Sequence, residues 1–319
     1  MRIVFFGTPD FAIPSLDALL GSDYDLLKVV TNPDKKSGRG LKHNSSPVST
    51  FCKINDIDCL YCSDFEDGEI YDELKSMNPD LFVVVAFKIL PEKIINIPKY
   101  GSVNLHPSLL PKYRGSSPIQ YAILNGEIET GVTIFRLNKQ VDSGHIVAQD
   151  KYVISDEINF SELYIELSNF GAQILMNAIG LIDSGNVKYI PQKEYDILSD
   201  SSNKITYAKK INIQDCRIDW NMSAIDINNK IRAFSKKPGA FTILNDKKIK
   251  ILKSTIYKDF NDSLTISECI SFRGLLLVGT RDFPIQIQSL QIEGKKEITG
   301  EDFINSTMLA KKNKAIKFD

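Results

Sequence analysis

Up to about residue 188, apolar runs alternate with segments in which apolar residues recur every three or four positions. This alternation predicts βαβ units and a mainly parallel, Rossmann-like α/β sheet. We expect strands near residues 2–6, 26–31, 58–61, 81–86, 101–105, 131–137 and 146–153. Helical patterns fall near residues 12–20, 47–55, 67–77, 117–125 and 160–184. The run 81–86 is apolar without alternation, which indicates a central strand covered on both faces.

Beyond this region the pattern changes to polar sequence rich in Ser and Asp, which indicates a linker. We therefore divide the chain into a domain at 1–188, a linker at 189–206 and a second domain at 207–319. In the second domain we expect a helix near 224–234, a final helix near 300–311, and short strands near 240–245, 248–256, 264–269, 273–279 and 284–291. Five short strands separated by turns favour an OB-like β-barrel, a frequent nucleic-acid binder.

Composition limits the class of protein. The chain has 319 residues, 43% of them hydrophobic and 25% charged, as is usual for a soluble globular protein. No stretch approaches the ~18 uninterrupted apolar residues of a membrane span. The N-terminus leads directly into a strand without the pattern of a signal peptide, so we expect a cytoplasmic protein. Nothing in the sequence requires more than a monomer.

The net charge of −1 conceals an asymmetry between the two domains. Residues 204–319 carry 21 Lys and Arg against 13 Asp and Glu, whereas the preceding part of the chain is acidic. A basic domain attached to an acidic one suggests a polyanionic partner. A Lys-rich surface that only keeps a small β-domain soluble explains the charge equally well.

The strand near 101–105 ends in Asn104-Leu105-His106-Pro107. Side chains two residues apart on a strand share a face, so Asn104 and His106 face the same side. About 28 residues later a second apolar strand leads into Val141-Asp142-Ser143-Gly144, a turn that can return a carboxylate to the first strand. An amide, an imidazole and a carboxylate together can polarise a carbonyl, stabilise an oxyanion and accept a proton.

A metal site is not expected. The three histidines are far apart in sequence and form no recognisable ligand set. Cys59 and Cys62 have C-x-x-C spacing, but the chain has no second such pair, so we interpret them as structural.

The Asn-x-His, the following Ser-Leu-Leu-Pro and the downstream Asp-x-Gly resemble the signature of the folate-dependent formyltransferase superfamily. This resemblance implies catalytic roles for Asn104, His106 and Asp142, and 10-formyltetrahydrofolate as formyl donor. It implies that folate contacts come from two loops, Ala86, Phe87, Lys88, Ile89, Leu90 and Pro91, and Ser108, Leu109, Leu110 and Pro111. Lys88 stands where the family pattern carries glycine, and a positive φ there would strain it.

Within the superfamily, the chain most resembles the enzymes that formylate the methionine on initiator tRNA. The basic loop around Gly38-Arg39-Gly40 and the segments Arg217-Ile218-Asp219-Trp220 and Pro238-Gly239-Ala240 carry this resemblance. It implies methionyl-initiator tRNA as acceptor and Arg39 as a tRNA contact. Further basic residues that we expect to contact tRNA are Lys35, Lys36, Lys42, Arg114, Lys209, Lys210, Arg232, Lys236 and Lys237.

Two other functions fit parts of the pattern. An amino-sugar formyltransferase would use the same scaffold and be indifferent to tRNA. A non-catalytic RNA-binding protein would have no need for Asn104, His106 and Asp142 together.

Overall fold

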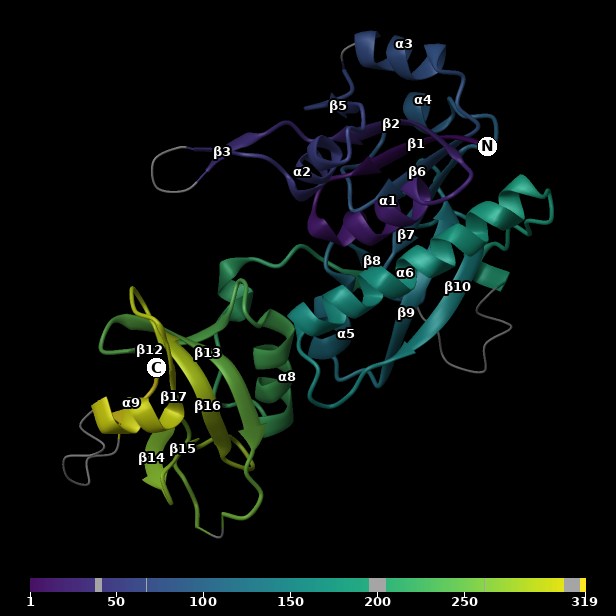
Figure 1. Cartoon of the computed structure of the whole chain (residues 1–319). Coiled ribbons are helices and arrows are strands. Elements are labelled where there is room, and N and C mark those ends of the chain that lie inside the picture. The colour runs from purple at the N-terminus through teal and green to yellow at the C-terminus, as the bar shows by residue number, and fades with distance from the viewer. Residues whose placement is uncertain (38–41, 67, 195–204, 261, 307–315) are drawn as a thin grey trace. The chain divides into compact units, whose positions relative to one another are not determined.

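The computed structural model forms two compact units (Figure 1). It describes residues 1–37, 42–66, 68–194, 205–260, 262–306 and 316–319. Unit 1 comprises residues 1–118, 129–153 and 164–208, and unit 2 comprises residues 119–128, 154–163 and 209–319. Most of the linker predicted at 189–206 lies outside the described residues, so the predicted domain boundaries stay a proposal.

Unit 1 contains a seven-stranded sheet in the order β10-β9-β7-β6-β1-β2-β5. The strands are β1 (Arg2–Gly7), β2 (Asp25–Thr31), β5 (Cys59–Tyr61), β6 (Leu81–Val85), β7 (Ser102–His106), β9 (Glu129–Arg136) and β10 (Ile146–Val153). The five strands from β7 to β5 are parallel, while β9 and β10 run antiparallel to their neighbours. The mainly parallel sheet predicted from the sequence is confirmed.

The centre of this sheet is its most completely buried part. All five residues of β6 are buried, as its uninterrupted apolar run predicts. Around it, Val4, Phe6, Phe82 and Ile94 form one hydrophobic cluster. Each such side chain contributes roughly 1.5–3 kcal/mol when it is fully buried. The strand order reverses between β6 and β1, and ligands of open parallel sheets bind beyond the carboxyl ends of strands at such a point.

Helices surround the sheet of unit 1 (Figure 1). They are η1 (Asp10–Ala12), α1 (Ile13–Leu20), α2 (Pro47–Ile54), α3 (Gly68–Ser76), α4 (Glu92–Ile95) and α6 (Phe160–Asp183), whose residues from Tyr164 onward belong to unit 1. The α2 helix begins as its sequence indicates, because the Ser46 side chain accepts a hydrogen bond from the Ser49 N–H and Pro47 occupies the first turn. The short α4 helix has too few residues to show a helical period and was not predicted.

The α6 helix is long and apolar enough to cross a membrane by length and composition alone. Half of its most apolar window is buried inside the protein. Leu167, Leu175 and Ile179 are fully buried, and Gly171 lies so close to β7 that an added Cβ would come within 2.9 Å of Leu105. These contacts are those of a core helix in a globular protein.

The basic loop after β2 is carried on a two-stranded hairpin. Its strands β3 (Lys35–Ser37) and β4 (Lys42–Asn44) pair antiparallel, and its tip at 38–41 lies outside the described residues. At its base, the Asp34 carboxylate accepts a hydrogen bond from the Ser45 hydroxyl (2.8 Å) and faces Lys53 (3.6 Å). The hydrogen bond from Ser45 and the nearby Lys53 hold the pKa of Asp34 below its usual value. These contacts hold the base of the hairpin in place.

In the part of the chain that the structure describes, unit 2 combines an antiparallel sheet with helices. Its strands are β12 (Ala240–Leu244), β13 (Lys247–Ile256), β14 (Glu268–Phe272), β15 (Leu275–Val278), β16 (Ile285–Ile292), β17 (Glu297–Thr299) and β18 (Ile316–Lys317). Its helices include α5 (Pro118–Leu124), η2 (Ile213–Cys216), α8 (Ala224–Phe234) and α9 (Gly300–Ser306). The order is β12-β13-β16-β15-β14-β18, with β17 beside β16. Asp319, just after β18, donates its N–H to the Ile243 carbonyl of β12, so the last strand returns to the first, as in an OB-like barrel.

Two elements of unit 2 differ from their predicted positions. The strand expected at 264–269 begins only at Glu268, because a turn precedes it: the Glu268 N–H donates to the Thr265 carbonyl and Ser267 has φ +64°. The helix expected at 300–311 is described as far as Ser306, and residues 307–315 lie outside the described residues.

The end of the chain is part of the core of unit 2. Phe318 is 2% exposed and stacks on Trp220 with ring centroids 5.6 Å apart. We expect Phe318→Ala to lower the free energy of unfolding of unit 2 by about 3–5 kcal/mol, the usual cost of emptying a buried aromatic site. Urea denaturation measures this, with Phe283→Ala (46% exposed) as the matched control that should cost little. Equal losses in the two variants would contradict this packing role.

Candidate active site

Asn104 and His106 lie at the carboxyl end of β7, in the interior of the sheet. Asn104 pairs with Val84 of β6 on one side and with Phe135 of β9 on the other. His106 is 5% exposed and lies edge-on to Phe135, with ring centroids 6.4 Å apart. Both side chains project from one strand, as the two-residue spacing predicts.

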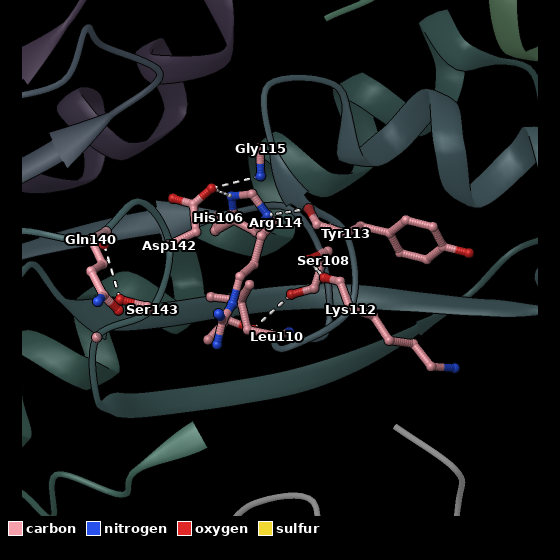
Figure 2. Close-up of polar contacts among 12 residues, drawn as sticks. His106, Ser108, Leu110, Lys112, Tyr113, Arg114, Gly115, Gln140, Asp142 and Ser143 are labelled. Atoms are coloured by element: carbon pink, nitrogen blue, oxygen red, sulfur yellow. Dashed lines mark hydrogen bonds and ion pairs between the residues drawn. The ribbon is translucent and has the colours of Figure 1, made fainter. Parts of the chain in front are cut away.

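The hydrogen bonds of His106 indicate its tautomer. Its Nε2 lies 2.9 Å from the Tyr113 carbonyl oxygen (Figure 2). Because a carbonyl can only accept, Nε2 carries the proton and donates it. The other nitrogen, Nδ1, then presents a lone pair toward Asp142, whose Oδ2 is 3.9 Å away. That distance is too long for a direct hydrogen bond, so the carboxylate faces the imidazole without bonding to it.

Asp142 is held at this position by backbone groups. Its Oδ2 accepts a hydrogen bond from the Gly115 N–H at 2.7 Å, and its side chain is nearly buried. The residue has φ +49°, a conformation that aspartate tolerates better than most side chains. Gly144 completes the turn: a Cβ there would lie 1.6 Å from the Arg136 carbonyl oxygen. The Asp-x-Gly pattern therefore has a steric cause.

Gln192 stabilises this turn from a distant part of the sequence. Its side chain is 4% exposed, and its Nε2 donates to the carbonyls of Asp142 (3.0 Å) and Gly144 (2.8 Å). Its Oε1 accepts from the Arg114 guanidinium through both Nε (3.1 Å) and Nη2 (2.5 Å). Sequence reasoning missed Gln192, because no local motif links it to the turn 50 residues earlier.

The loop from Ser108 to Pro111, expected to contact folate, is bound tightly to β9. The Ser108 hydroxyl donates to the Lys112 carbonyl (2.7 Å), and Thr133 of β9 bonds both the Ser108 carbonyl and the Leu110 N–H. Ser108 and Leu110 are buried, whereas Leu109 is partly exposed. The buried members build the loop, and the folate contacts of all four residues stay a prediction.

The second loop expected to contact folate follows β6 at the switch point. The residue with positive φ is Ala86 (+49°), so the strain anticipated for Lys88 falls elsewhere. Lys88 donates from Nζ to the Cys62 carbonyl (2.6 Å) and lies 5.3 Å from the ring centroids of Phe65 and Phe87. Its ammonium group therefore attaches this loop to the residue that follows β5. Ala86 and Ile89 are exposed, Phe87 and Pro91 are intermediate, and Leu90 is buried.

The basic residues expected to bind tRNA fall in several places. Lys35, Lys36 and Lys42 belong to the β3–β4 hairpin, and Arg39 lies outside the described residues. Four of these basic residues lie in unit 2 with exposed side chains: Lys209, Lys210, Lys236 and Lys237.

Arg232 differs from these exposed residues, because its guanidinium makes internal contacts. It donates to the carbonyls of Ile158 (2.9 Å) and Ser155 (3.4 Å) and to the Asn229 side chain (2.8 Å). Burial lowers the pKa of this guanidinium. These contacts hold segment 154–163 against α8, a structural role that the sequence did not indicate. Contact of Arg232 with tRNA stays a prediction.

One polar atom of the site has no hydrogen-bond partner among the described residues. This atom is Asn104 Oδ1, which is buried. Buried acceptors are almost always paired, and an unpaired one costs roughly 1–3 kcal/mol. Asn104 projects from the same strand as His106, and an acceptor without a partner at this position is suited to receive an N–H from a bound ligand. Among the residues that the structure describes, no group of three or more His, Cys, Asp or Glu could hold a metal ion.

Comparison with known proteins decides the family. The formyl transferase family matches residues 1–179, and the formyl transferase C-terminal domain matches residues 210–308. Over 313 residues the chain is 38% identical to the methionyl-tRNA formyltransferase of Fusobacterium nucleatum, covering 97% of this chain and 98% of that one. The chain belongs to the methionyl-tRNA formyltransferase family. The resemblance stated from the sequence is therefore confirmed.

Solved structures agree on the fold of this methionyl-tRNA formyltransferase family member. An N-formyltransferase from Helicobacter canadensis, in complex with folinic acid and dTDP-3-aminofucose, superposes with a TM-score of 0.67 at 23% identity, over 90% of this chain and 98% of that one. HypX from Aquifex aeolicus, in complex with tetrahydrofolic acid, gives a TM-score of 0.64 at 16% identity. The chain spans about half of HypX, 51% of its length, while all of this chain is covered.

Proposed function

We propose that this chain transfers the formyl group of 10-formyltetrahydrofolate to the α-amino group of methionyl-initiator tRNA. The product is N-formylmethionyl-tRNA for translation initiation. The observation that carries the proposal is the buried Asn104 Oδ1, which has no partner among the described residues. It lies on the strand that also carries His106, which faces Asp142, in a chain that belongs to this family along nearly its whole length. The folate supplies the formyl group, and the loops at 86–91 and 108–111 are the residues that would hold it.

The first task of the site is to position the amine and stabilise the oxyanion. An α-amine titrates near ~8, so a large share of it is neutral at cellular pH without help from the enzyme. In our proposal the Asn104 amide N–H donates to the formyl oxygen, and its Oδ1 accepts an N–H from the ligand. Such preorganised donors stabilise the negative charge that develops on the oxygen during attack.

The second task is to move a proton. Attack forms a bond between the α-nitrogen and the formyl carbon, and the bond from that carbon to the folate nitrogen then breaks. Because the Nε2–H of His106 is donated to Tyr113, we assign proton acceptance to Nδ1 of His106 and the facing carboxylate of Asp142. The proton that the amine loses is then available for the departing folate nitrogen. His106 and Asp142 thus act as one proton-holding pair.

The remaining parts of the proposal concern partners and location. We infer that the domain at 207–319 binds tRNA through its basic surface, since residues 204–319 carry 21 basic and 13 acidic side chains. We infer a monomeric protein of the bacterial cytoplasm, because nothing in the proposed reaction requires a second subunit or a membrane.

Formyl transfer from 10-formyltetrahydrofolate to methionyl-initiator tRNA tests the proposal directly. Methionyl-elongator tRNA is the comparison, and a panel of free nucleotide-linked amino sugars is the competing acceptor. Transfer to the initiator and little to the elongator supports the proposed function. Folate consumption with the sugars and none with either tRNA would instead assign the chain to sugar formylation.

Arg39 provides a test of tRNA binding that is independent of the chemistry. We expect Arg39→Ala to raise the KM for methionyl-initiator tRNA about tenfold, because loss of a phosphate or base contact costs roughly 1–3 kcal/mol. The rate at saturating tRNA should change little, and the salt dependence of KM should weaken. Steady-state kinetics at two salt concentrations measure both. An unchanged KM would remove Arg39 from the interface.

A further inference from the structure

We propose that residues 206–208, at the end of unit 1, are a positioning element for the active site, with Thr206 as its main positioning residue. The proposal rests on the proposed function. It concerns residues 113–117, here called the catalytic loop, which follow the Ser-Leu-Leu-Pro motif. Sequence reasoning assigned residue 206 to a linker, whereas in the structure residues 206–208 pair with the loop that bonds His106 and Asp142.

The contacts between the two segments are regular. The Tyr113 N–H donates to Thr206 Oγ1 (2.8 Å), and the Arg114 N–H donates to the Thr206 carbonyl (2.9 Å). The Ser116 N–H donates to the Ala208 carbonyl (2.9 Å). Together they form a short parallel pair of strands, β8 (Arg114–Gly115) and β11 (Tyr207–Ala208). Thr206 thus accepts two hydrogen bonds from the loop, one through its backbone carbonyl and one through its side-chain hydroxyl.

The opposite edge of the same loop holds the catalytic residues. The Tyr113 carbonyl accepts the Nε2–H of His106 (2.9 Å), and the Gly115 N–H donates to Asp142 Oδ2 (2.7 Å). The Tyr113–Arg114 peptide bonds both sides: its carbonyl accepts from His106, and its N–H donates to the Thr206 carbonyl. Because a peptide unit is planar and rigid, a displacement on the Thr206 side is passed on to the His106 side.

Gly115 makes this close approach possible. It has φ +121°, and a Cβ there would lie 2.4 Å from the Ala208 carbonyl oxygen. The glycine in the family-like sequence Lys112-Tyr113-Arg114-Gly115 is thus explained by contact with residues 206–208. Immediately after Ala208 the chain continues with Lys209 and Lys210, both exposed and both expected to contact tRNA. The positioning element is therefore adjacent in sequence to residues expected to engage the substrate.

The test compares Thr206→Val with Thr206→Ser in the full-length protein. Valine keeps the branched shape but removes the acceptor of the Tyr113 N–H, whereas serine restores a hydroxyl. Single-turnover formylation is measured with saturating methionyl-initiator tRNA and 10-formyltetrahydrofolate. We expect valine to slow the chemical step about 10- to 100-fold, as small misplacements of reacting groups do, with an unchanged KM for tRNA. Serine should return the rate to near the wild-type value.

Thr280→Val is the matched control. Thr280 is buried in unit 2, where its hydroxyl donates to the Phe283 carbonyl, so this variant loses a buried hydrogen bond far along the chain from the catalytic loop. Its rate should equal that of the wild type. A rate for Thr206→Val within about twofold of wild type, or an equal fall in the serine variant, would overturn the positioning role.

A second measurement does not depend on formylation. The chain has only three histidines, so the imidazole nitrogen signals of His106 can be assigned in a ¹⁵N NMR spectrum. We expect Thr206→Val to shift the Nε2–H signal of His106 and Thr206→Ser to leave it in place. An unmoved signal in the valine variant overturns the inference. An inactive wild type in the kinetic assay would instead count against the proposed function.

Discussion

Asn104→Ala is expected to lower the rate of formyl transfer by about 10²–10³-fold, the usual cost of removing one donor to a developing oxyanion. Binding of methionyl-initiator tRNA should be unchanged, because Asn104 lies within the sheet of unit 1, two residues from His106. Stability should also be nearly unchanged. The Asn104 Oδ1 makes no hydrogen bond to the residues that the structure describes, so truncation breaks none at that oxygen. Single-turnover kinetics, tRNA binding and thermal unfolding separate the three effects.

Asn169→Ala is the matched control for this experiment. Asn169 is exposed on α6, and its side chain makes one local hydrogen bond to the Ile165 carbonyl. It should retain the full rate. If Asn104→Ala kept a rate within about threefold of wild type, the oxyanion role would be withdrawn, because a lost donor that matters costs far more.

Gly144→Ala is expected to lower turnover strongly while unit 2 stays folded. The added Cβ would lie 1.6 Å from the Arg136 carbonyl and 3.2 Å from the Phe135 ring, so the turn has to move. Moving it carries Asp142 away from His106 and breaks the bonds from Gln192 to Asp142 and Gly144. We expect a fall in turnover of at least about 10²-fold, because a displacement of ~1 Å has that cost.

Gly21→Ala distinguishes this steric effect from a general cost of replacing glycine. Gly21 has φ −81°, and a Cβ there would make only an ordinary contact of 3.6 Å with the Asp17 carbonyl. The control variant should have wild-type turnover and stability. Near-normal turnover in Gly144→Ala would show that the turn can relax without moving Asp142, contrary to the geometry described above.

Local sequence was sufficient for the parts of the site that belong to regular elements. The apolar run at 81–86 predicts β6, and the two-residue spacing places Asn104 and His106 on one face of β7. The return of Asp142 to this edge follows from an antiparallel strand and a short turn. These inferences succeed because strand period and turn geometry depend only on neighbouring residues.

The residues that sequence reasoning missed are those placed by tertiary contacts. Gln192 and Thr206 resemble ordinary polar residues near a linker, and no spacing relates them to Asp142 or Tyr113. The bonds from the Arg232 guanidinium to the carbonyls of segment 154–163 were likewise not indicated by its charge, while its contact with tRNA stays a prediction. A basic side chain looks the same in sequence whether its partner is a phosphate or a buried carbonyl. Only the path of the chain distinguishes these cases.

The pairing of Tyr113 with Thr206 spans 93 residues, and this has a consequence for how the protein becomes active during its own synthesis. A chain emerging from the ribosome folds its N-terminal part first, and contacts distant in sequence form last. The sheet strands β1, β2, β5, β6, β7, β9 and β10 are all complete by Val153. The catalytic loop, however, has its full set of bonds only after Ala208 has been added. We therefore expect nascent chains that end before Thr206 to form the sheet and yet remain catalytically incompetent.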